Sequence, residues 1–231
     1  GGGRDRVRGR LSAGSGPLKL LVGLGKPGRE YEGHRHNVGF MAVERIAERW
    51  RFPGWRSKWQ GRISEGALDG ERALLLEPLT FMNESGRSVA AAVRFLKLPF
   101  PDVVVFHDEL DLAPGKVRVK LGGGVAGHNG LRSIAQCLGT PEFRRVRIGI
   151  GHPGHKDRVT GHVLADFAKV ERPWLERLLD ALAEAAPLLA AGDDAGFMNK
   201  VALLSRDPEE EARRAERKAA RAAAAGAQGS G

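Results

Sequence analysis

Residues 106–133, FHDELDLAPGKVRVKLGGGVAGHNGLRS, say more about the fold than any other part of this 231-residue chain. The stretch begins at the end of a β-branched run, DVVVFHD at residues 102–108, which predicts a central strand. It then combines two acidic clusters, two histidines, a glycine triplet and an asparagine beside a histidine. Glycines and unpartnered polar groups cost folding free energy, so a segment built only for packing would not combine them. We therefore expect a buried strand followed by a functional loop.

Two other segments have the same mixed composition. They are GLGKPGREYEGHRHNVGF at residues 23–40 and PLTFMNESGRSV at residues 78–89. Each places a histidine or an asparagine, whose side chain can form hydrogen bonds, beside glycines and apolar residues. Because all three segments adjoin apolar runs, we expect one framework to bring them together as a single site.

Short apolar runs that alternate with segments of helical period indicate an α/β fold. Strands are expected at residues 18–25, 72–78, 102–108, 117–121 and 144–151, and helices from residue 37 and at residues 85–96, 129–138 and 171–190. This alternation predicts a single domain with a twisted mixed β-sheet flanked by helices on both faces. Such sheets place their sites beyond the carboxyl ends of the strands, and His36, Asn83 and Asp108 all follow apolar runs.

The charge of the chain suits a polyanionic partner. The net charge is +9, of which residues 1–18 contribute +3 and residues 205–231 contribute +1, leaving +5 for residues 19–204. We expect residues 1–18 to be a disordered basic extension and residues 19–204 to form the α/β domain. Residues 205–231 are rich in Ala, Arg and Glu and offer no apolar stripe, so they are expected to be an exposed tail and a candidate for RNA contact.

Cysteine content and hydropathy bear on the compartment. The single cysteine, Cys137, excludes an intramolecular disulfide and favours a reducing compartment, and its helical neighbours favour burial over catalysis. No apolar run approaches the roughly 20 residues that span a membrane. The basic start of the chain has no apolar segment of the secretory type. We therefore expect a cytoplasmic protein that does not contact membranes.

His36 is the histidine best placed to act as a general base. It directly precedes Asn37, the expected N-cap of the first helix. A helix N-terminus disfavours the imidazolium ion, so the ring is kept neutral and able to accept a proton. Asp108 could bond the other ring nitrogen and stabilise the imidazolium ion. These two effects on the pKa of His36 oppose each other, and the sequence leaves their net result open. The competing interpretation is that His36 only packs or caps the helix.

Five motifs occur in one order: GLGKPG with Tyr31, RHNVGF, TFMNESG, HDELDL and KLGGGVAGHNGLRSI. From about residue 19 to residue 204, the chain resembles the bacterial-type peptidyl-tRNA hydrolases. The resemblance implies a monomeric esterase that releases tRNA from peptidyl-tRNA without a metal or cofactor. It assigns general-base catalysis to His36 and orientation of that base to Asp108. It also implies that Asn83, Asn129, Tyr31 and Phe81 contact the peptidyl-tRNA end, although Phe81 and Met82 would equally suit a core.

Lys26 is where the chain departs from this family, which normally has Asn at this position of the GLGxPG loop. A lysine is longer, carries a charge and has no acceptor atom. We predict that its cation repels the ammonium group of free aminoacyl-tRNA, so that rejection of this molecule persists. We also predict that Lys26→Asn raises turnover of the blocked substrate.

Other classes of protein were weighed against the same residues. The GLGKPG motif matches a dinucleotide fingerprint, but Pro27 and residues 29–36 intervene where a helix should begin. His34 and His36 would point to opposite sides of an extended segment, and no HExxH or paired CxxC motif indicates a metal. No GxSxG elbow indicates a serine hydrolase. A catalytically silent RNA-binding relative is the alternative from another class, favoured only by Lys26. The role of His128 is left open.

Overall fold

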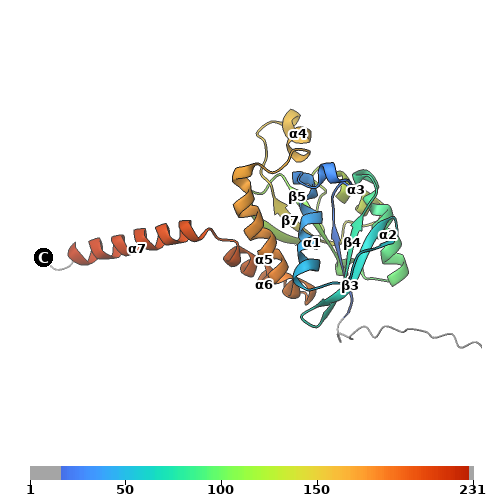
Figure 1. The fold of residues 1–231 in the computed structure, drawn as a ribbon, viewed down its shortest axis with the longest axis horizontal. Helices are drawn as coiled ribbons and strands as arrows, with labels where there is room; N and C mark the ends of the chain where they lie inside the picture. The colour runs from blue at the N-terminus through green and yellow to red at the C-terminus, as the bar shows by residue number, and fades with distance from the viewer. Residues whose placement is uncertain (1–16, 229–231) are drawn as a thin grey trace, which may run out of the picture.

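A seven-stranded mixed β-sheet forms the centre of the molecule (Figure 1). Its order is β2-β3-β4-β1-β5-β7-β6, with β4, β1, β5 and β7 parallel and the other neighbours antiparallel. The strands are β1 Lys19–Gly23, β2 Arg56–Lys58, β3 Gly61–Leu68, β4 Glu71–Pro78, β5 Val103–Glu109, β6 Val117–Leu121 and β7 Arg144–Gly149. The computed structural model describes residues 17–228, so most of the basic extension expected at residues 1–18 lies outside the described residues.

Helices cover both faces of the sheet, which confirms the predicted fold class. One face packs against α1 Val38–Arg49, α5 Arg172–Ala190 and α6 Asp194–Leu204, and the other against α2 Ser85–Leu96 and α3 Asn129–Leu138. A short helix, α4 Val159–Val163, lies beyond one end of the sheet, and α7 Pro208–Gln228 extends away from the domain (Figure 1). Within residues 17–228, no helix is both long and apolar enough to cross a membrane.

The alternation of side chains along the central strands creates two hydrophobic cores. Leu21 of β1 and Phe106 of β5 point to the core under α1 and α5, while Leu20 and Val105 point to the core under α2 and α3. Because β5 is covered on both faces, all seven of its residues are buried. This burial explains why the continuous apolar run at residues 102–108 correctly predicted a central strand.

Two predicted helices agree with the structure in their boundaries, and several elements were missed, among them β3 and α6. The expected helices at residues 85–96 and 129–138 coincide with α2 and α3. The strand β3 was not predicted because its sequence, GRISEGAL, interrupts its apolar residues with charges and glycines. The helix α6 was also missed, since Phe197 and Val201 are its only fully buried residues and give little helical periodicity.

Two glycines let α1 begin in contact with the central strands. A Cβ atom at Gly39 would overlap the carbonyl oxygen of Phe106 and lie 2.5 Å from that of Leu24. A Cβ atom at Gly23 would lie 2.5 Å from the carbonyl oxygen of Gly39. The backbone of Leu24 bonds to Phe106 at 3.1 Å and accepts from Phe40 at 3.2 Å. The start of α1 is therefore held against the carboxyl ends of β1 and β5.

We predict that Gly39→Ala destabilises the fold by about 1–3 kcal/mol, the usual cost of adding a methyl group where the backbone leaves no room. The matched control is Gly161→Ala in α4, where an added Cβ meets no atom within 4 Å. The free energy of unfolding in urea is the measurement. Equal stability of the two variants would show that α1 does not need this close approach.

Candidate active site

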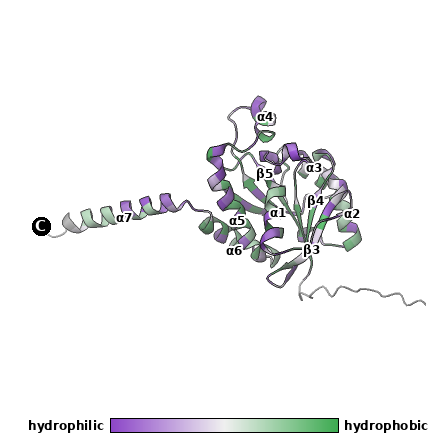
Figure 2. Cartoon of the chain, in the orientation of Figure 1, coloured by the Kyte–Doolittle hydropathy of each residue, from purple (hydrophilic) through white to green (hydrophobic). Residues whose placement is uncertain are grey.

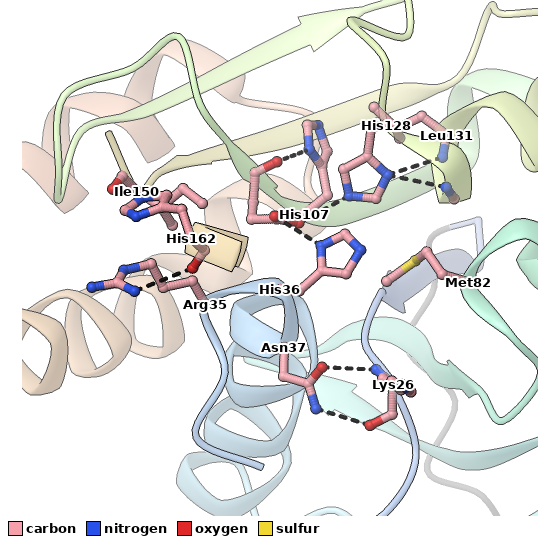
Figure 3. Close-up of polar contacts among 12 residues, drawn as sticks. Lys26, Arg35, His36, Asn37, Met82, His107, His128, Leu131, Ile150 and His162 are labelled. Carbon is pink, nitrogen blue, oxygen red and sulfur yellow. Dashed lines mark hydrogen bonds and ion pairs between the residues drawn. The ribbon is translucent and has the colours of Figure 1, made fainter. Parts of the chain in front are cut away.

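The carboxylate of Asp108 lies between two imidazole rings. Its Oδ2 is 2.9 Å from Nδ1 of His36, and its Oδ1 is 2.9 Å from Nε2 of His128 (Figure 3). Asp108 belongs to β5, His36 to the short 3-10 helix Arg35–Asn37 before α1, and His128 to the N-cap position of α3. Asp108 is only 5% exposed. Three segments that are distant in sequence thus converge on one buried carboxylate.

The hydrogen bonds of His128 define its protonation. Its Nδ1 accepts hydrogen bonds from the backbone N–H groups of Gly130 at 3.1 Å and Leu131 at 3.4 Å (Figure 3). The ring proton must therefore be on Nε2, which donates to Asp108. His128 caps the N-terminus of α3 and holds the catalytic carboxylate candidate from the side opposite His36. The sequence had left this role open, since an imidazole is not among the common capping side chains.

The Nε2 atom of His36 is free to accept a proton. Because Asp108 accepts a hydrogen bond from Nδ1–H, the lone pair of Nε2 is available as a proton acceptor. Nε2 has no hydrogen-bond partner among residues 17–228, and the side chain of His36 is 17% exposed. This is the arrangement expected of a general base that is oriented by a carboxylate.

The site shifts the pKa values of its members in opposite directions. Burial lowers the pKa of His36, the adjacent Asp108 carboxylate raises it through charge and hydrogen bonding, and the cation of Lys26 lowers it; the net result is a raised pKa. Burial raises the pKa of Asp108, but the two imidazoles outweigh it and hold this pKa well below its ordinary value. Asp108 is therefore ionised and makes His36 a stronger base. This resolves the balance that the sequence had left open.

The structure corrects the predicted role of Asn37. It occupies the N-cap position of α1, but its side chain forms no capping hydrogen bond. Instead, Oδ1 accepts from the backbone N–H of Lys26 at 2.8 Å, and Nδ2 donates to the carbonyl oxygen of Lys26 at 2.9 Å (Figure 3). This paired contact fixes the GLGKPG loop to the residue that follows His36.

Lys26 lies where this loop borders a large cavity. Its Nζ lies 4.0 Å from the centroid of the Tyr31 ring, a cation–π contact. Lys26, Tyr31, Trp59 and Phe81 together line a cavity of about 850 Å³. Phe81 is 73% exposed, so it does not pack in a core, whereas Met82 packs partly buried against one.

The two predicted asparagines lie on neighbouring elements. Asn83 is in the 3-10 helix Met82–Glu84, which packs against α3, and Asn129 is the first residue of α3. Both are exposed, and neither side-chain amide forms a hydrogen bond with another described residue. Both amides are therefore available to a ligand.

A second cavity, of about 260 Å³, lies beside His128 and was not predicted. It is lined by His107, His128, Lys120, Arg145 and Arg147, among others. In the β6–β7 register, Lys120 lies opposite Arg145 and Arg118 lies opposite Arg147. Like charges in directly opposed positions destabilise a sheet, and Glu109, which also lines the cavity, offsets part of this repulsion by pairing with Arg147 at 2.8 Å. The alternation in VRVKL indicated a half-exposed strand but not which cations would face the site.

His36, Asp108 and His128 also satisfy the spacing of a metal centre, with one ligand atom each within 4.8 Å of one another. The hydrogen bonds of His128 disfavour this use. A metal on its Nε2 would displace the ring proton to Nδ1, where two backbone N–H groups already donate. The donor set therefore suits an ionised carboxylate with two ring N–H donors better than a cation.

An α/β sheet that carries a carboxylate-oriented imidazole at the carboxyl edge of its parallel strands is an arrangement that suits an enzyme with a histidine base. The family model described as peptidyl-tRNA hydrolase matches residues 20–211. The peptidyl-tRNA hydrolase of Nitrobacter hamburgensis is 61% identical over 186 residues, covering 80% of this chain and 91% of that protein. That of Parvibaculum lavamentivorans is 62% identical over 192 residues, covering 82% and 93%.

Solved structures agree with these sequence relationships. A crystal structure of peptidyl-tRNA hydrolase from Acinetobacter baumannii has a TM-score of 0.75 and 40% identity, covering 80% of this chain and 94% of that chain. A complex of peptidyl-tRNA hydrolase with N-propanol has a TM-score of 0.76 and 39% identity. The chain belongs to the peptidyl-tRNA hydrolase family, as its motifs had indicated, and it is an enzyme.

We predict that His107 makes the fold sensitive to acid. Burial lowers the pKa of His107 to about 3, with a further contribution from His128. Between the ordinary value near 6.5 and about 3, only the unfolded chain binds this proton, so stability falls with decreasing pH by up to about 1.4 kcal/mol per unit. In His107→Gln, the slope of unfolding free energy between pH 6.5 and 4.5 should be smaller by about that amount. An unchanged slope would contradict the assignment.

Proposed function

We propose that this enzyme hydrolyses the ester bond between peptide and tRNA with a water molecule activated by Nε2 of His36. The observation that carries this proposal is the buried, ionised Asp108, which fixes the tautomer of His36 and leaves Nε2 free. The catalytically silent alternative would not need an oriented imidazole with a raised pKa. Membership of the family supports the hydrolytic reading.

In the first step, Nε2 of His36 takes a proton from water while the water oxygen attacks the ester carbonyl carbon. The carbonyl π bond breaks, and a tetrahedral oxyanion forms. The imidazolium ion is stabilised by the charge of Asp108, to which its Nδ1–H already donates. The exposed side-chain amides of Asn83 and Asn129 are neutral donors suited to the developing oxyanion or to the adjoining nucleotide.

In the second step, the oxyanion collapses and the bond between the carbonyl carbon and the ribose oxygen breaks. The proton on Nε2 of His36 passes to the leaving ribose oxygen. The products are a peptide with a free carboxylate and a tRNA with its terminal hydroxyl restored. His36 returns to the neutral state in which it started, so the cycle needs no other group.

The terminal nucleotides and peptide fit the cavity that Lys26, Tyr31 and Phe81 line. Phe81 offers an exposed aromatic face, on which bases stack in a sequence-tolerant way, and the half-buried ring of Tyr31 lines the same cavity. The cation of Lys120, in the cavity on the other side of His128, suits a tRNA phosphate, whereas Arg147 in the same cavity pairs with Glu109 at 2.8 Å. The ester is then held between an aromatic and a cationic surface.

We also propose that the enzyme acts as a monomer in the cytoplasm. Both edge strands carry cations, Arg56 and Lys58 on β2 and Arg118 and Lys120 on β6, which oppose pairing of one sheet edge with another. The single cysteine, Cys137, suits a reducing compartment.

We predict that His36→Ala lowers turnover of N-acetyl-aminoacyl-tRNA by about 100-fold or more, because a positioned general base contributes at least this factor. Binding of tRNA should persist, since its phosphate contacts lie elsewhere. The matched control is His155→Ala, whose side chain is 65% exposed and distant in sequence from the site. Near-normal turnover in the His36 variant would exclude His36 as the base.

For Lys26, we predict a shift in the pH profile. Its cation lowers the pKa of His36, so Lys26→Asn should raise that pKa and move the ascending limb of kcat/KM to higher pH. At a pH above the ascending limbs of both proteins, turnover of the blocked substrate should be higher in Lys26→Asn than in the parent protein. Lys26→Arg keeps the charge and should leave the limb in place. A limb that does not move in Lys26→Asn would show that Lys26 does not act on His36.

A further inference from the structure

The charges of α7 are sorted along its length and around its axis. The acidic residues Glu209, Glu210 and Glu211 are in the first turn, where they interact favourably with the helix dipole. Five basic residues follow: Arg213, Arg214, Arg217, Lys218 and Arg221. At 3.6 residues per turn, these five lie within an arc of about 140°. The small net charge of the tail therefore conceals a strongly basic face.

This basic face has few partners within the protein. Residues 208–226 are all exposed, and α7 runs away from the domain as a hydrophilic helix that becomes paler toward its end (Figures 1 and 2). Arg213 pairs with Glu209 at 3.2 Å. The other four basic side chains form no ion pair within residues 17–228. Cations spaced four residues apart repel one another on a helix, so an external anion would stabilise α7.

The opposite face of α7 decides what kind of anion fits. It carries alanines and Glu216, with no bulky apolar residue after Pro208. A helix that lies in a membrane surface needs Leu, Phe or Trp opposite its cations, and a helix that docks in a protein groove needs apolar anchors. A basic face about 12 Å long, from Arg213 to Arg221, without such anchors instead suits the regular phosphates of an RNA helix.

A line of cations connects this helix with the active site. On the edge strand β6, Arg118 and Lys120 share a face because side chains alternate along a strand. Lys120 lines the cavity beside His128. Arg118 and Lys116 line another cavity, of about 500 Å³, together with Arg206 and Glu210 at the start of α7. Acidic residues also line the two cavities, Glu109 and Asp111 in the first and Asp207 and Glu210 in the second, so the cations form a series along β6 from the site to the base of the helix and not an unbroken positive surface.

We propose that the basic face of α7 binds the phosphate backbone of the helical arm of the substrate tRNA, outside the catalytic domain. The proposal rests on the proposed function, because it takes the tRNA held at His36 as the ligand. Because α7 is remote from the reacting ester, its contacts stabilise bound substrate and transition state equally. They lower KM and leave kcat unchanged.

The test compares two full-length variants. In the first, Arg214, Arg217, Lys218 and Arg221 are all changed to Gln, which removes the charge and keeps good helix propensity. In the second, Arg214→Lys, Arg217→Lys and Arg221→Lys preserve the charge. The measurements are the Kd for deacylated tRNA as a function of salt, and kcat and KM for N-acetyl-aminoacyl-tRNA.

In the Gln variant, we expect the Kd at physiological salt to rise by about tenfold or more, and the slope of log Kd against log salt to fall by about 3–4, or nearly 1 for each of the four lost contacts. KM should rise with Kd while kcat stays unchanged. The Lys variant should match the parent protein. Circular dichroism should show the same helix content in all three proteins.

An unchanged Kd and salt slope in the Gln variant would overturn the proposal. A second outcome would also overturn it: the parent protein binds vesicles containing phosphatidylserine, the Gln variant does not, and both proteins bind tRNA with the same Kd. The ligand of α7 would then be a membrane. Failure of the proposed function can be distinguished from failure of this proposal. In the first case the parent protein would not release tRNA from N-acetyl-aminoacyl-tRNA, but the Kd for deacylated tRNA would still show whether α7 binds it.

Discussion

The site depends on the hydrogen bonds that the ionised carboxylate of Asp108 accepts from His36 and His128. A buried carboxylate is stable only when it is fully hydrogen-bonded, and here each oxygen accepts from a different imidazole. Its charge fixes the proton of His36 on Nδ1 and that of His128 on Nε2. His128 in turn caps α3, so the same carboxylate ties a helix, a strand and the base together. Loss of either imidazole would leave an acceptor unpaired in the interior.

Backbone packing gives this network its geometry. Gly23 and Gly39 allow the start of α1 to touch the ends of β1 and β5, and His36 lies three residues before Gly39. Asn37 then fastens the backbone of Lys26 to the same turn. As a result, the GLGKPG loop is tied through the backbone of Lys26 to the residue that follows His36. This coupling is why a cation in that loop can tune the pKa of His36.

The candidate active site and the cations proposed to bind RNA occupy different parts of the molecule. His36 and Asp108 are at the carboxyl edge of the parallel strands, which packing on both faces holds in place. The cations are on the edge strand β6 and on α7, where side chains reach solvent. Phosphate contacts tolerate such exposed, flexible groups because they act through charge, whereas proton transfer from water requires a fixed distance. The fold therefore separates a precise site from a broad electrostatic surface.

The sequence by itself determined the α/β class with a mixed sheet covered on both faces, the boundaries of α2 and α3, and the segments that form the candidate site, because these depend on local periodicity and on residue types suited to few other uses. It also indicated the pairing of His36 with Asp108, although their catalytic roles remain predictions. Only the tertiary structure decided that Asn37 clamps Lys26 instead of capping α1, that His128 caps α3, and that the pKa of His36 is raised. Each of these depends on the distance between segments that are far apart in the chain. The strength of a hydrogen bond or of a charge interaction varies steeply with this distance, and a local sequence pattern does not predict it.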